Sequence, residues 1–312
     1  MMRRRISGQV NLEDLTRICP ILSRRNHPEF EGERQLEVEV AGVRFGAGVP
    51  VVIAGPCAVE SEQQTMELAR SVRAAGADML RGGAYKPRTS PHDFQGLGLD
   101  GLKILRAASD ETGLPLVTEV MDVRLVGLVA EYADMLQIGS RNMQNYPLLV
   151  EAGRSGKPVL LKRGMAASLC EWLGAAEYIA NEGNLKIVLC ERGIKTHGAS
   201  EYCRYLLDLN VIQAAHEETF LPIVVDPSHA TGVATAVESA SRAAIEFGSD
   251  GLIIEVSNYG VEAGVPRPLC DADQAISPAT LRRIVAFILN RERNSEAEVA
   301  VVNAGEPESR RR

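Results

Sequence analysis

From residue 50 onward, short apolar runs alternate with longer stretches in which apolar residues recur at helical spacing. Stretches such as EQQTMELARSVRAAG and AVESASRAAIEFG predict helices. Near-continuous apolar runs are typical of strands buried on both faces of a parallel sheet, and the chain offers VVIAG (51–55), ADMLRG (77–82), PLVTE (115–119), ADMLQIG (133–139), PVLLKRG (158–164), KIVLCERG (186–193), PIVVDPS (222–228) and GLIIEVS (251–257). These strand and helix units predict a (β/α)8 TIM barrel over residues 49–291.

The two ends of the chain carry different patterns. LEVEVAGVRFG (36–46) alternates apolar and polar residues, which predicts a short hairpin that caps the bottom of the barrel. Residues 1–35 are expected to be a loosely attached lead-in, so residues 1–48 form an N-terminal extension. Residues 292–312 lack a sustained apolar face and are expected to be a disordered tail.

Nearly every predicted strand ends in a functional group. An open, doubly wound sheet would concentrate its chemistry at one switch point, whereas a barrel gathers it from the carboxyl ends of all its strands. The strand ends supply, in order, Cys57, Arg81, Glu119, Gln137 with Arg141, Lys162, Glu191 with Arg192, Asp226 with His229, and Glu255. This distribution favours the closed barrel.

Composition and charge narrow the class of ligand. The formal net charge of -7 and the pI near 5.4 argue against a nucleic-acid partner. No apolar run approaches the length of a membrane helix and no signal-peptide core follows the N-terminal arginines, so we expect a cytoplasmic protein without a membrane partner. The six cysteines are scattered without a C-x-x-C pair, which indicates reduced thiols.

The stretch LRGGAYKPRTS (80–90) gathers cations in a sequence that forms turns rather than the exposed face of a helix. In a barrel these cations would face the same cavity as those at other strand ends, where they suit the phosphate and carboxylate groups of two small substrates. The set is Arg81, Lys86, Arg141, Lys162 and Arg192. The alternative is a structural network in which they pair with Glu119, Glu191 and Asp226.

Three further strand ends suit a metal. Cys57, His229 and Glu255 would offer one soft, one borderline and one hard ligand, a set that fits a single divalent ion such as Mn, Fe, Co or Zn. The alternative is that the cysteine and the histidine are ordinary core residues.

With these residues in place, the chain resembles the 3-deoxy-D-arabino-heptulosonate 7-phosphate (DAHP) synthases of the type Iβ subgroup, over roughly residues 17–256. The ordered motifs that carry the resemblance are IAGPCAVES (53–61), LRGGAYKPRTSPHDFQGLG (80–98), TEVMD (118–122), LQIGSRNMQN (136–145), KPVLLKRGM (157–165), AEYIANEGN (176–184), LCERGI (189–194) and VDPSHATG (225–232). The resemblance implies a transferase that condenses phosphoenolpyruvate with erythrose 4-phosphate and water at the start of the shikimate pathway.

The resemblance also implies roles for individual residues. Lys86, Glu119, Cys57 and His229 carry over as catalytic residues, with Lys86 as an acid for the new hydroxyl. The substrate-binding residues that carry over are Arg81, Lys86, Arg88, Thr89, Arg141, Lys162, Arg192 and Asp226, of which Arg88 and Thr89 receive the phosphate of the aldose. The implied metal ligands are Cys57, His229, Glu255 and Asp271. Family members assemble as homodimers or homotetramers, so one of these states is expected.

The pattern departs from the family after the eighth strand, in EVSNYGVEAGVPRPLCDADQAISP (255–278). Ser257 and Asn258 stand where the family has His-Pro, and the following loop is longer. Asp271 is preferred as the fourth ligand because Gln274 follows it at the family's spacing, with Asp273 as the alternative. The altered loop leaves two other functions open, a synthase with a different aldose acceptor in specialised metabolism and a noncatalytic regulatory barrel.

Cys270 precedes the proposed ligand Asp271. In oxidised, metal-free protein it could pair with Cys57 and silence the enzyme; the alternative is a buried bystander thiol.

Overall fold

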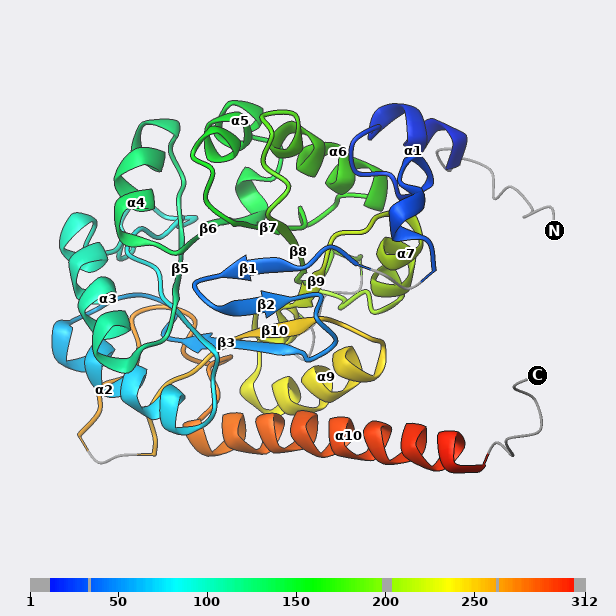
Figure 1. The fold of residues 1–312 in the computed structure, drawn as a ribbon. Coiled ribbons are helices and arrows are strands. Elements are labelled where there is room, and N and C mark those ends of the chain that lie inside the picture. Colours follow the sequence, from blue (N-terminus) through cyan, green and yellow to red (C-terminus); the bar gives the residue numbers. More distant parts are fainter. Residues whose placement is uncertain (1–11, 33–34, 198–203, 262–263, 306–312) are drawn as a thin grey trace, which may run out of the picture.

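The computed structural model describes residues 12–32, 35–197, 204–261 and 264–305, in which parallel strands close into a barrel in the order β10-β3-β4-β5-β6-β7-β8-β9 (Figure 1). The predicted TIM barrel is therefore confirmed, and each predicted strand is present. The strands are β3 (Val51–Gly55), β4 (Met79–Arg81), β5 (Leu116–Glu119), β6 (Met135–Ile138), β7 (Val159–Lys162), β8 (Ile187–Glu191), β9 (Ile223–Val225) and β10 (Gly251–Glu255).

Helices cover the outside of the barrel. Those that follow the strands are α2 (Glu62–Ala74), α3 (Leu99–Thr112), α4 (Val126–Tyr132), α5 (Tyr146–Arg154), α6 (Leu169–Ala180), α7 (Asn210–Glu218), α9 (Ala234–Glu246) and α10 (Pro278–Gly305), with the short α8 (Pro227–Thr231), η3 (Val123–Leu125) and η4 (Ser140–Asn142) between them. Helix α10 packs through Leu281, Ile284 and Ile288 and continues beyond residue 291, the expected end of the barrel.

The repeated sequence Ala-Asp-Met-Leu at 77–80 and 133–136 fixes strand register. Asp78, just before β4, accepts a hydrogen bond from the Val52 N–H of β3 at 2.8 Å. Asp134, just before β6, accepts one from the Leu116 N–H of β5 at 2.7 Å. Each carboxylate thus satisfies a strand N–H that would otherwise be unpaired at the amino end of the barrel.

The predicted hairpin is present as β1 (Val38–Val40) and β2 (Val43–Phe45). Ala41 and Gly42 join the strands with φ values of 45° and 91°, the positive angles of a tight turn that matches the twist of a hairpin. Phe45 is fully buried and packs with Val38 and Val40 against the apolar side chains that fill the barrel interior. The hairpin therefore closes the amino end of the barrel.

The described part of the lead-in is packed against the barrel wall, contrary to our expectation of loose attachment. It forms α1 (Leu12–Ile18), η1 (Arg24–Asn26) and η2 (Pro28–Phe30). Glu177 of α6 accepts hydrogen bonds from the backbone N–H groups of Ile21 and Leu22, at 2.6 and 3.1 Å. These contacts are long-range, which is why the short local pattern did not reveal them.

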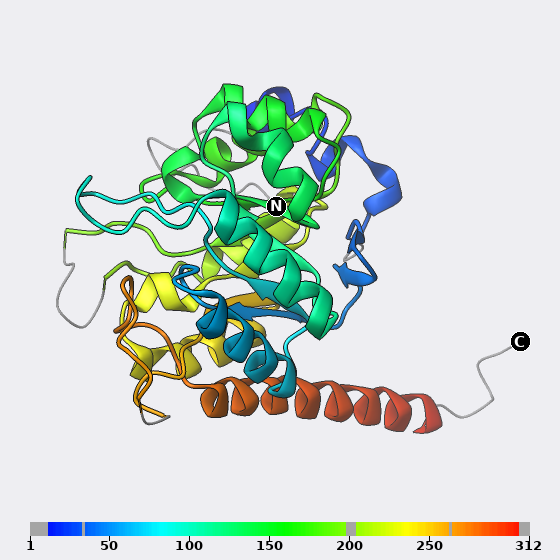
Figure 2. The same ribbon diagram turned by 90° about the vertical axis from the view of Figure 1, so that its left-hand side faces the viewer.

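The loops that follow the carboxyl ends of the strands lie at the end of the barrel opposite the hairpin (Figure 2). Within the described residues, no helix is both long enough and apolar enough to span a membrane. The loop end of the barrel is where the candidate site lies.

Candidate functional site

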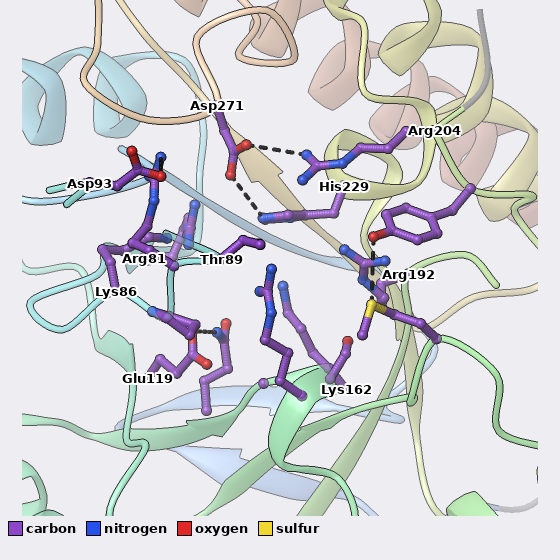
Figure 3. Close-up of a pocket in the computed structure, with 18 residues that line it drawn as sticks. Arg81, Lys86, Thr89, Asp93, Glu119, Lys162, Arg192, Arg204, His229 and Asp271 are labelled. Carbon is purple, nitrogen blue, oxygen red and sulfur yellow. Dashed lines mark hydrogen bonds and ion pairs between the residues drawn. The ribbon is translucent and has the colours of Figure 1, made fainter. Parts of the chain in front are cut away.

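The carboxyl ends of the strands surround one cavity rich in cations (Figure 3). Most of the site residues predicted from the sequence line it: Arg81, Lys86, Arg88, Thr89, Glu119, Arg141, Lys162, Arg192, His229 and Asp271. Three others, Cys57, Asp226 and Glu255, are buried and contact residues of the lining. The structure therefore brings the predicted residues together.

Arg81 and Lys86 donate hydrogen bonds to two buried residues behind the cavity, Glu255 and Cys57. The Arg81 Nη1 donates to the Glu255 carboxylate at 2.7 Å, and the Lys86 Nζ donates to the Cys57 carbonyl oxygen at 3.1 Å. Gly83 allows this packing, because a Cβ there would lie 2.5 Å from the Cδ of Lys86 and 2.9 Å from the Cys57 carbonyl oxygen. Burial by itself lowers the pKa of Lys86, but the acidic groups of Cys57 and Glu255 outweigh it and raise that pKa.

Asp226 ties together two residues of the lining. It accepts hydrogen bonds from the Lys162 Nζ at 2.5 Å and the His229 Nδ1 at 2.7 Å, and its other oxygen accepts from the His229 backbone N–H. Burial alone would raise the pKa of this carboxyl, but His229 and Lys162 hold it well below its ordinary value. Asp226 thus orients His229 so that the Nε2 of the ring faces the carboxylates of Glu255 and Asp271.

Ion pairing does not account for every cation. Arg192 is buried, and its Nη1 has no hydrogen-bond partner within the described residues. Its guanidinium lies 4.3 Å from the ring centroid of Tyr205, which fixes its plane while the cavity remains open to it. The hydroxyl of Ser140, on the cavity lining, is likewise without a partner in the described chain. Unpartnered buried donors of this kind favour an anionic ligand over a purely structural network.

Glu119 lies at the end of β5 and faces the cavity beside Gln137, whose amide donates to its carboxylate at 3.3 Å (Figure 3). Gly139 leaves room for this carboxylate, because a Cβ there would lie 2.0 Å from the Glu119 Oε1. The glycine in LQIGS therefore has a steric role that its sequence alone did not reveal.

Glu191 points away from the cavity, into a buried network. Its carboxylate accepts from the Arg163 Nη1 at 2.9 Å and from the Gly193 N–H at 2.6 Å, and Arg163 also donates to Asp208 at 2.9 Å. The network fixes the backbone on both sides of Arg192. Glu191 therefore has a structural role, but its partner is Arg163, which was not among the five cations considered from the sequence.

The residues Cys57, Glu255 and Asp271 bring one potential metal-donor atom each to within 4.8 Å of one another. The His229 Nε2 lies beside them, 3.4 Å from the Glu255 Oε1 and 3.8 Å from the Asp271 Oδ2. Thiolate, imidazole and two carboxylates form a donor set that fits a divalent transition metal. Asp273, the alternative to Asp271, pairs instead with Arg267 at 2.7 Å, and its side chain is 77% exposed.

The thiol of Cys270 lies directly against that of Cys57, with 2.9 Å between the two sulfur atoms. Both residues are buried, and both cysteines are free. The hydrogen bond to Cys270 and the burial of the site raise the pKa of the Cys57 thiol. The two thiols therefore lie close enough together for the oxidative pairing hypothesised from the sequence.

Arg204 and Tyr205 are among the lining residues that the sequence did not predict. They follow no apolar periodicity and lie more than ten positions after the end of β8 in the sequence, so no local pattern marked them. The altered segment after β10 continues the strand briefly, because Val256 and Ile276 form a parallel bridge. Asn258 is buried there and donates to the Ser71 hydroxyl of α2 at 3.5 Å.

Comparisons with known proteins agree with this site. The model of the DAHP synthetase I family matches residues 30–291. A phospho-2-dehydro-3-deoxyheptonate aldolase of Thermotoga maritima is 48% identical over 236 residues, which cover 76% of this chain and 68% of the relative. A 2-dehydro-3-deoxyphosphooctonate aldolase of Syntrophotalea carbinolica is 33% identical, with 83% of this chain and 99% of the relative covered.

Among solved structures, the DAHP synthase of Thermotoga maritima matches with a TM-score of 0.78 and 42% identity, covering 89% of this chain and 77% of that one. A truncated form of the enzyme from the same organism matches with a TM-score of 0.77 and 38% identity, covering 90% and 97%. The chain therefore belongs to the DAHP synthetase I family.

Proposed function

We propose that this chain is a metal-dependent DAHP synthase, which condenses phosphoenolpyruvate with erythrose 4-phosphate and water to give DAHP and inorganic phosphate. The observation that carries the proposal is the meeting, in one cavity, of cations from different strand ends with a Cys, His, Glu and Asp donor set. The relatives named as DAHP synthases support it.

The cavity suits two anionic substrates. Arg81, Lys86, Arg141, Lys162 and Arg192 would hold the phosphate and carboxylate of phosphoenolpyruvate, with the unpartnered Arg192 Nη1 as one donor. Arg88 and Thr89, which line the same cavity on the loop after β4, would receive the phosphate of the aldose. Bound in this way, the two substrates would meet in one cavity with their reacting carbons oriented.

Bond formation joins C3 of phosphoenolpyruvate to the aldehyde carbon of the aldose. Lys86 would donate a proton to the aldehyde oxygen as it becomes a hydroxyl, and Glu119 would take a proton from the water that adds at C2. The resulting hemiketal phosphate then loses inorganic phosphate by cleavage of its C–O bond. A divalent cation held by Cys57, His229, Glu255 and Asp271 would supply Lewis-acid polarisation when bound, its identity being Mn, Fe, Co or Zn.

The direct test is product identification. Protein reconstituted with metal is incubated with phosphoenolpyruvate and erythrose 4-phosphate, and the product is identified by mass spectrometry beside a chelated sample and a sample given arabinose 5-phosphate instead. We expect the seven-carbon acid phosphate in the metal-loaded sample alone. Absence of product with erythrose 4-phosphate would overturn the proposal.

A variant pair tests the cavity itself. Arg192→Leu should raise the KM for phosphoenolpyruvate, because it removes a buried donor that faces the cavity. Arg124→Leu is the matched control, since the side chain of Arg124 is 86% exposed and pairs with its neighbour Asp122. An equal KM in the two variants would contradict this placement of phosphoenolpyruvate.

We propose further that the chain acts as a homodimer or homotetramer.

A further inference from the structure

The backbone of Asp271 adopts a conformation that needs outside support. Its φ is +50°, in the left-handed region that residues other than glycine rarely adopt. Asp271 lies on the loop between β10 and α10, where the Leu269 N–H donates to the Glu60 carboxylate at 2.8 Å. The Asp271 carbonyl oxygen accepts from the Gln274 N–H at 3.3 Å, which makes a short turn around the residue. These backbone contacts do not by themselves determine where the side chain points.

Arg204 fixes the direction in which the Asp271 side chain points. Its Nη1 donates to the Asp271 Oδ1 at 3.2 Å (Figure 3). The same nitrogen donates to the Gln274 Oε1 at 2.9 Å. The amide nitrogen of Gln274 in turn donates to the Glu255 Oε2 at 2.5 Å. One arginine therefore connects the loop after β8 with two carboxylates that come from the end of β10 and the loop beyond it.

The second oxygen of each carboxylate faces the other potential metal donors. The Asp271 Oδ2 lies 3.5 Å from the Cys57 sulfur and 3.8 Å from the His229 Nε2. The Glu255 Oε1 lies 3.4 Å from the same nitrogen and also accepts the hydrogen bond from the Arg81 Nη1 at 2.7 Å. Each carboxylate thus has one oxygen held by the Arg204 and Gln274 pair and the other turned toward the donor cluster.

We propose that Arg204 is a positioning residue for the metal site: through Asp271 directly and Glu255 by way of Gln274, it holds one oxygen of each carboxylate toward the cation. The inference rests on the metal-dependent function proposed above. Partners of this kind change metal affinity by about 10- to 100-fold when removed. The alternative is that Arg204, which also lines the cavity, serves only to bind substrate.

Cobalt binding separates these roles without any need for turnover. Apo-protein, kept reduced under nitrogen, is titrated with Co²⁺ in the absence of substrates, and the thiolate-to-cobalt absorption band and the visible d–d bands are followed. We expect Arg204→Met to raise the Kd for Co²⁺ by about tenfold or more. The thiolate band should persist at saturation because Cys57 is untouched, whereas the d–d bands should change with the altered carboxylate coordination.

Three further variants sharpen the test. Gln274→Leu should weaken Co²⁺ binding in the same direction, and combining it with Arg204→Met should add little, because the two residues act in one chain of contacts. Arg204→Lys should restore affinity in part. Arg267→Met is the matched control, since Arg267 pairs with the exposed Asp273 on the same loop.

The outcomes are distinguishable. An unchanged Kd for Co²⁺ in Arg204→Met, with a raised KM for erythrose 4-phosphate, would overturn the positioning role and assign Arg204 to substrate binding. Equal loss in Arg204→Met and Arg267→Met would also overturn it, because the effect would then belong to the loop as a whole. Wild-type protein that fails to bind Co²⁺ would instead refute the metal-dependent function on which the inference rests.

Discussion

Replacing Asp226 by asparagine tests how charge is compensated behind the cavity. The side chains of Asp226 and Lys162 are 1% and 5% exposed. The Asp226 carboxylate also accepts hydrogen bonds from the backbone N–H and the ring Nδ1 of His229. Asp226→Asn keeps the shape but leaves the Lys162 ammonium buried without a counter-charge. Loss of one partner of a buried pair costs about 3–5 kcal/mol, so we expect the free energy of unfolding to fall by about that amount at pH 7.

The direction in which the pKa of Asp226 is shifted determines how this difference in unfolding free energy depends on pH. Because the pKa of Asp226 is lowered in the folded protein, its stabilising contribution is complete above the ordinary carboxyl value of about 3.9. It is lost only as the pH falls through the lower folded value. The gap between wild type and Asp226→Asn should therefore persist from pH 7 to about pH 4.5 and narrow below pH 4.

Urea unfolding followed by fluorescence measures this gap. Trp172 is the sole tryptophan, is fully buried in α6 and donates to the Leu161 carbonyl oxygen of β7, next to Lys162. Glu111→Gln is the matched control, because Glu111 pairs with Arg70 at the surface and its loss should change stability little. A gap below 1 kcal/mol at pH 7, or one that closes between pH 7 and pH 5, would refute the reasoning.

Two other features of the site, the space at Gly139 and the pair of thiols, give sharp predictions. Gly139→Ala should lower kcat by about tenfold or more with the fold intact, because its Cβ would displace the Glu119 carboxylate. Gly127→Ala is the control, because a Cβ at that position meets nothing within 4 Å. Equal kcat values in the two variants would contradict the role given to Glu119. Oxidation of metal-free protein should remove two titratable thiols by joining Cys57 to Cys270, whereas bound metal should protect them. An unchanged thiol count after oxidation, or the same loss of thiols in Cys270→Ser, would show that the pair does not form.

The fold was predictable because its signals are local and repeated. Eight apolar runs with functional groups at their ends determine a barrel and its catalytic end, and the alternation in residues 36–46 determines the hairpin. The attachment of residues 12–32 was not predictable, since it depends on Glu177, more than a hundred residues away. The boundaries at residues 48 and 291 remain predictions, although α10 extends beyond the second.

Within the site, the sequence indicated which residues meet but not how each one is oriented. Arg81 and Lys162 were predicted as substrate ligands, and each is also held by a buried carboxylate. Glu191 was a strand-end candidate, yet its carboxylate turns to Arg163. Strand position decides which end of the barrel a residue occupies, whereas rotamer and partner depend on neighbours that only the closed barrel supplies.

The charge arrangement explains how an acidic chain presents a cationic cavity. The carboxylates of Glu255 and Asp226 are almost fully buried behind the lining, so they offset the cost of burying Arg81 and Lys162 without reaching the cavity as acceptors. An anion that enters the cavity therefore meets donors whose counter-charges lie on the far side, at fixed positions. Because these donors are already oriented, little reorganisation is needed when negative charge moves during the reaction, which is the condition for electrostatic stabilisation of a transition state.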